Sequence, residues 1–259
     1  MTLIVALAAL VAVAAAARST WSPCGLSMLS TITPMAERSR GRRWGLTATW
    51  FILGATLGGA TLGVLAVVGA SLIGLLDLPA RAVLGTAAVA ALVTACMDLG
   101  IGTRMPHHRR QVDEMWLDQF RSWVYGIGFG FQIGTGLMTY IMTAAVYLTV
   151  MLAALTGSAV AAMGLALLFG ATRGAAILLG AGLTEPDRLR RFHRRFEALG
   201  PAVRLGVIGV QVGVAAVAAG AAWGALGALT TAAVGVAAAL ATRGVQAPAA
   251  DPAALLLER

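Results

Sequence analysis

The sequence is poor in charge, has no lysine and contains only two cysteines. Charged residues make up 12% of the 259 positions and hydrophobic residues 59%, and the mean hydropathy is +0.83. All 19 basic residues are arginine, which reflects genomic base composition as readily as chemistry. The net charge of +8 therefore does not indicate nucleic-acid binding; in a membrane protein, arginine reports orientation instead.

Cysteine and histidine are too sparse for a scaffold or a metal centre. Cys24 and Cys96 are too few for a disulfide framework and lack the spacing of a metal finger. One short segment does collect soft ligands that would suit copper, but without tight spacing: Cys96, Met97, Met105, His107 and His108. We therefore expect no metal and no cofactor, and we expect any thiol chemistry to be local to one site.

Long apolar runs dominate the chain instead. They exceed the ~20 residues that cross a bilayer, and they are continuous rather than alternating with period two, which excludes barrel strands. This predicts an all-α membrane protein, a polytopic bundle of six to seven transmembrane helices. The first run lacks the positive region of a signal peptide and is taken as a span. The runs fall at 3–34, 45–76, 80–102, 122–155, 158–183, 203–222 and 224–243.

The arginines predict the orientation of the bundle. Three connectors are rich in arginine (residues 38–43, 104–110 and 188–195), whereas those near Asp77 and Gly157 are not. Because arginine-rich loops stay in the cytoplasm, we expect a multi-pass protein of the bacterial cytoplasmic membrane with its N-terminus outside.

Two arginine-rich segments are also amphipathic. Apolar residues recur at helical spacing in 104–121 and in 184–201, where Thr184 is a candidate cap. We expect both helices to lie flat at the interface, as anchors or as docking sites for a soluble partner. The tail, 244–259, is expected to be poorly ordered.

The two halves of the chain contain similar stretches. "FILGATLGGATLG" is echoed by "LLFGATRGAAILLG", and "PCGLSMLSTIT" more weakly by "FQIGTGLMTYI", which aligns Cys24 with Gln132. Because the first and fourth spans are expected to cross the membrane in opposite directions, the two halves would be inverted three-helix repeats, as in many transporters. Chance similarity between Gly/Ala-rich helices is an alternative. The predicted division is a first repeat (1–103), a connector (104–121), a second repeat (122–222), an additional helix (223–243) and the tail.

A proline and three charges interrupt the apolar runs. The first run is too long to cross straight, so Pro23 is expected to break it just before Cys24 and to open a small polar pocket. Arg18, Asp98 and Arg173 lie inside apolar runs, where charges are usually paired. Similar depths predict an Asp98–Arg173 ion pair, more as a structural clamp than as a proton relay.

The residues around Cys24 carry a family resemblance. "WSPCGLSML", a basic turn and "GLTATWFILGATLGGATLG" resemble the first two spans of the CcdA/DsbD cytochrome c biogenesis family. The resemblance implies two inverted repeats whose paired cysteines pass electrons from cytoplasmic thioredoxin to an external thiol protein. It makes Cys24 the first redox cysteine.

The sequence departs from that family at the second cysteine. Where the family has Pro-Cys-Ile-Gly, this chain has Phe-Gln-Ile-Gly, ending at Gly134, and Gln132 cannot form a disulfide. Cys96 is the one other thiol that could pair with Cys24. Two alternatives to thiol exchange remain: a transporter moving a solute or metal ion past Gln132, Thr135, Asp98 and Arg173, or a non-catalytic assembly subunit.

Overall fold

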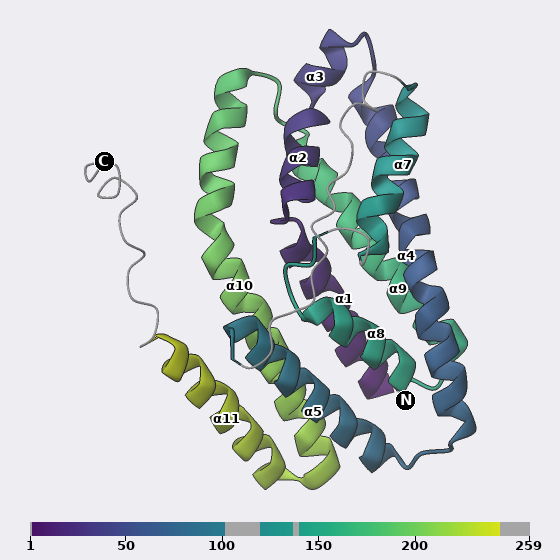
Figure 1. The fold of residues 1–259 in the computed structure, drawn as a ribbon, viewed down its shortest axis with the longest axis vertical. Helices are drawn as coiled ribbons and strands as arrows, with labels where there is room; N and C mark the ends of the chain where they lie inside the picture. Colours follow the sequence, from purple (N-terminus) through teal and green to yellow (C-terminus); the bar gives the residue numbers. More distant parts are fainter. Residues whose placement is uncertain (1, 102–119, 137–139, 244–259) are drawn as a thin grey trace, which may run out of the picture.

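The computed structural model describes residues 2–101, 120–136 and 140–243, and its regular elements there are helices (Figure 1). Within these residues, six helices are long and apolar enough to cross a membrane. The prediction of an all-α polytopic membrane protein is confirmed. Most of the predicted amphipathic connector 104–121, and the tail 244–259, lie outside the described residues.

The first apolar run is broken near Pro23, as the sequence predicts. It forms α1 (Thr2–Ser19) and α2 (Pro23–Thr31), followed by the short α3 (Pro34–Ser39). Pro23 occupies the first turn of α2, where its missing N–H costs nothing, and the Ser22 hydroxyl accepts from Gly25 N. The next two runs form uninterrupted helices, α4 (Trp44–Leu75) and α5 (Ala80–Leu99).

The fourth run does not form the single span expected at 122–155. It divides into α7 (Ser122–Thr135) and α8 (Ala145–Leu155). The end of α7 coincides with Gly136, whose φ of 72° leaves the helical region at little cost for a residue without Cβ. Then α9 (Ala159–Ala175) continues as the 3-10 turn η1 (Ala176–Gly180).

The basic amphipathic segment does not lie apart from the span that follows it. Both belong to one helix of 38 residues, α10 (Pro186–Trp223), which continues through Pro201 and begins after Glu185 rather than Thr184. The expected flat interfacial helix is therefore wrong at 184–201. The chain then forms α11 (Ala225–Arg243) in the position of the seventh run.

The ends of the helices divide the molecule as the arginines predict. Figure 1 places α3 and the start of α10 at one end, and the N-terminus with the α4–α5 connection at the other. The arginine-rich residues 38–43 and 188–195 thus share an end.

Helix packing mixes the two halves of the chain. Helix α4 packs on α7 and α9, α1 packs on α8 and α9, and α5 packs on α10. Small residues allow this closeness: a Cβ added to Gly59 would lie 2.9 Å from Gly170 Cα. The repeat boundaries at 103 and 122 stay predictions.

Candidate functional site

The gap between α7 and α8 places two helix ends inside the bundle. An end of this kind leaves backbone N–H or C=O groups without helical partners, and lipid supplies none. Partners must come from other helices. The structure provides them from two of the charges that the sequence singles out, Asp98 and Arg173.

Asp98 binds the start of α8. Its Oδ1 accepts from the backbone N–H of Ala144, the N-cap residue, at 2.7 Å, and its Oδ2 accepts from the Thr143 hydroxyl at 2.5 Å. Gln211 on α10 donates Nε2 to Oδ2 at 3.0 Å. The N-terminal end of a helix carries partial positive charge, so the α5 carboxylate acts as an N-cap supplied by another helix.

Arg173 binds the end of α7. Its guanidinium donates to the Ile133 carbonyl oxygen at 2.6 Å and lies 6.0 Å from the Phe169 ring centroid. The side chain is buried on α9. A cation at the negative end of a helix is electrostatically favourable.

The predicted Asp98–Arg173 ion pair is therefore corrected. Depth along a helix axis suggested that the two charges could meet, but each side chain faces a different half of the broken fourth run. The two charges stabilise two helix ends of opposite polarity instead of each other.

Two more arginines surround Asp98. Arg204 on α10 donates Nε (3.2 Å) and a terminal nitrogen (2.6 Å) to the backbone oxygen of Asp98. Arg18, at the end of α1, lies within electrostatic range of both Asp98 and Arg204 and is 9% exposed. The Asp98 carboxylate thus lies near the guanidinium groups of Arg18 and Arg204. The net charge of these three groups is positive, which disfavours cation binding at this point. Among the described residues, buried Gln211 Oε1 has no hydrogen-bond partner.

Cys24 is buried rather than solvated. The thiol residue is 2% exposed and belongs to an apolar cluster that includes Met28, Phe51 and Phe129. Near the break, Ser19 and Thr20 donate their hydroxyls to the Ala15 and Ala16 carbonyls of their own helix, and the polar pocket at Cys24 stays a prediction. Cys24 and Cys96 form no disulfide with each other.

The other predicted site residues are divided among the helices. Arg173 lies within electrostatic range of Cys24, so these two are brought together. Gln132 and Gly134 lie on α7, where Gly134 contacts α4 closely at Ala55. Thr135 donates to the Phe131 carbonyl and receives a long 3.5 Å contact from Thr61. Met105, His107 and His108 lie outside the described residues.

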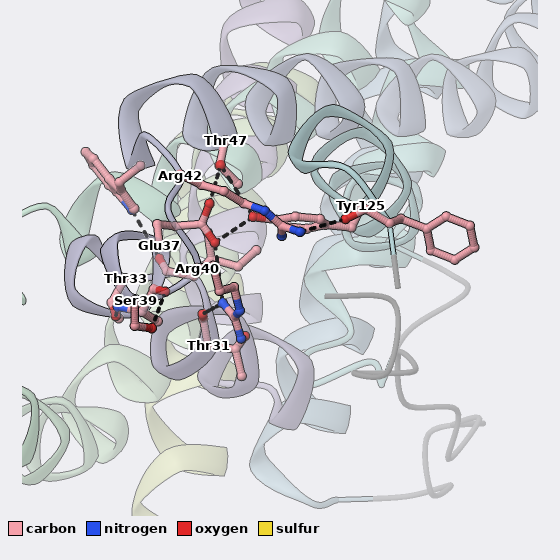
Figure 2. Close-up of polar contacts among 12 residues, drawn as sticks. Thr31, Thr33, Glu37, Ser39, Arg40, Arg42, Thr47 and Tyr125 are labelled. Atoms are coloured by element: carbon pink, nitrogen blue, oxygen red, sulfur yellow. Dashed lines mark hydrogen bonds and ion pairs between the residues drawn. The ribbon is translucent and has the colours of Figure 1, made fainter. Parts of the chain in front are cut away.

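A second buried carboxylate, Glu37, was not found from the sequence. Its side chain is fully buried and accepts from Thr47 at 2.5 Å and from the Tyr125 hydroxyl at 2.6 Å, with Arg40 at 3.4 Å (Figure 2). Arg42 lies over the Tyr125 ring, 5.2 Å from its centroid. Glu37 thus joins α3, α4 and α7 at the arginine-rich end. Only the arginines of this connector entered the prediction from the sequence, as markers of orientation.

Comparison with known proteins gives one consistent result. The chain is 32% identical over 170 residues to "Methylamine utilization protein MauF" of Methylophilus methylotrophus, covering 60% of this chain and 55% of that protein. It is 32% identical over 157 residues to the protein of the same name from Paracoccus versutus, covering 60% and 57%. With the Paracoccus denitrificans protein of that name it is 31% identical over 184 residues, covering 68% and 64%.

The chain thus spans less than two thirds of the length of these relatives. No family model matches it. No solved structure shows a significant match either.

These relatives overturn the resemblance to the CcdA/DsbD family. Five curated proteins that match at 30–34% identity are all named MauF, and none is named as a cytochrome c biogenesis protein. Transfer of electrons through Cys24, with thioredoxin as partner, is corrected with it. Local structure accounts for the Pro-Cys stretch. Pro23 begins α2, and Cys24 packs in the apolar cluster with Met28 and Phe51.

Proposed function

We propose that the chain is an integral membrane component of methylamine utilization. The observation that carries the proposal is the shared name of the five relatives. The six apolar helices support a site of action within a membrane. By the distribution of arginine we assign it to the cytoplasmic membrane, with residues 38–43 and 188–195 in the cytoplasm and the N-terminus outside.

We further infer that the broken fourth run is the working part of the protein. Half-helices whose ends meet inside a membrane are costly, since each end needs a buried partner. Here Asp98 and Arg173 meet that need from two other helices. Because α7 and α8 are each held by a separate charged side chain, a change at either Asp98 or Arg173 can reposition one of the two half-helices. An unbroken span offers no such point of control.

Growth tests the role in methylamine utilization. In a methylotroph, deletion of the gene should abolish growth on methylamine and leave growth on methanol or succinate unchanged, and the wild-type chain should restore it. Asp98→Asn should restore growth poorly, even when the variant is as abundant in the membrane as the wild type. Asp77→Asn alters an exposed carboxylate in the connection between α4 and α5 and should restore growth fully. Unimpaired growth of the deletion strain on methylamine overturns the proposal.

Accessibility tests the orientation. Single cysteines introduced at exposed Arg190 and exposed Asp77, in a chain without Cys24 and Cys96, should react with an impermeant maleimide from opposite sides. Position 77 should label in intact cells and position 190 only after lysis. The reverse pattern contradicts the assignment.

A further inference from the structure

A groove runs along the membrane-facing side of α5. It has a volume of about 960 Å³ and lies between α5, α8 and the end of α10. Val89 and Val93 line it and are 56% and 52% exposed, so the groove opens sideways from the bundle. It is separate from the helix caps and does not depend on the proposed function.

The groove is mainly apolar, with Thr86, Thr94 and Tyr147 also in its lining, and it is charged at one end. Its middle and inner part are lined by residues such as Val89, Val93, Met97 and Met151. At the outer end, Arg81 and Trp223 lie next to each other, and Arg81 donates Nε to the Ala222 carbonyl at 2.7 Å. Arginine and tryptophan together are typical of the headgroup level of a bilayer.

Arg81 retains donors for an anion. Among the described residues its hydrogen bond is made by Nε, which fixes the guanidinium and leaves both terminal nitrogens for another acceptor. A planar guanidinium held in this way matches the two free oxygens of a phosphate.

The groove is long enough for an extended chain. Arg81 and Met97 are sixteen residues apart on α5, roughly 24 Å along the helix axis. This length lies within the ~30 Å thickness of the hydrocarbon core.

We propose that this groove binds one phospholipid, with its phosphate on Arg81 and an acyl chain along Val89, Val93 and Met97. The charge at one end and the apolar walls beyond it complement a phospholipid end to end. A helix of a second copy would have to bring its own acidic group to Arg81.

Native mass spectrometry tests this site. The full chain is purified in a mild detergent with added palmitoyl-oleoyl phosphatidylglycerol, and the lipid retained on each protein is counted. Wild type should retain one molecule. Arg81→Ala should reduce retention about tenfold, as expected for loss of one charge-assisted contact, and Arg81→Lys, which keeps the charge but not the planar fork, should keep only part of it. Val93→Trp, which fills the groove, should remove it.

Matched variants separate this site from general lipid contact. Val68→Trp changes a valine of similar exposure on α4, and Arg190→Ala removes an exposed arginine at the other end; both should retain the lipid. Equal loss in Val68→Trp and Val93→Trp overturns the proposal. A second outcome also overturns it: the wild type forms a dimer without lipid, and Val93→Trp dissociates that dimer. The groove would then hold a second copy of the chain rather than a lipid.

Discussion

Trp21 and Phe196 stack face to face across the bundle. Their ring centroids are 4.1 Å apart at an interplanar angle of 4°, and the Trp21 indole donates Nε1 to the Phe196 carbonyl oxygen at 2.7 Å. Trp21 also lies over Gly200. One side chain from the α1–α2 break thus braces α10 in the turn where Pro201 removes a backbone hydrogen bond.

This contact predicts that Trp21 keeps the basic half of α10 in place. Trp21→Ala should raise hydrogen exchange of amides 188–199, because both the stack and the hydrogen bond are lost. Trp21→Phe, which keeps a ring, should show a smaller rise. The control is Trp50→Ala on the exposed side of α4. Unchanged exchange in Trp21→Ala contradicts the prediction.

The cap on α8 predicts a graded response at Asp98. Asn is also a good N-cap, so Asp98→Asn should destabilise the fold by about 1 kcal/mol, whereas Asp98→Ala should cost about 3 kcal/mol by leaving Ala144 N–H and Thr143 without their acceptor. Denaturation by SDS in mixed micelles measures both. Asp77→Asn serves as the matched carboxylate, because Asn tolerates the positive φ of 43° at that position, and equal effects of Ala and Asn at position 98 would exclude capping.

The cap on α7 predicts that a positive charge at position 173 is not enough for full stability without the shape of the guanidinium group. Arg173→Met should destabilise by about 2 kcal/mol because the buried Ile133 carbonyl loses a charged donor. Arg173→Lys should recover only part, since a lysine lacks the planar fork that also lies against Phe169. The same SDS titration, with exposed Arg188→Met as control, reports the difference; a fully stable Arg173→Met refutes it.

Burial predicts different reactivity for the two thiols. Cys24 is 2% exposed, while Cys96 is partly exposed. In detergent, N-ethylmaleimide should modify Cys96 first and Cys24 only after denaturation. Cys24→Ser and Cys96→Ser each leave one thiol, so mass spectrometry assigns the rates. Faster reaction of Cys24 would be incompatible with the packing described.

The buried Glu37 predicts a polar joint at the arginine-rich end. Glu37→Gln keeps the size of the side chain but leaves one of the Thr47 and Tyr125 hydroxyls facing an amide N–H₂, and should cost about 2 kcal/mol. Glu185→Gln, an exposed glutamate in a weak surface pair, should cost almost nothing. Thermal unfolding in detergent measures both, and equal midpoints would contradict a structural role of the Glu37 cluster.

Features set by hydrophobic length and by proline could be predicted from the sequence. The runs 45–76 and 80–102 correspond to Trp44–Leu75 and Ala80–Leu99, and the break near Pro23 is present. These depend on local chemistry alone. No proline marks the break after Thr135, and Gly136 is one of 32 glycines, so the sequence did not single it out as the end of a helix.

The partners of the buried charges could not be predicted in the same way. Counting residues gives the depth of Asp98 and Arg173 in the membrane, but not the direction in which each side chain faces around its helix. The contact of Trp21 with α10 beside Pro201 likewise joins residues far apart in the sequence. Both features arise from tertiary contacts between segments that the sequence leaves separate.

The unbroken course of α10 connects the two ends of the molecule. Its 38 residues extend over about 57 Å, from five exposed arginines at one extremity, past Arg204 and Gln211 at Asp98, to Trp223 at the other. The side chains that hold Asp98, and through it the start of α8, therefore belong to the same helix as the arginines outside the apolar part of the bundle.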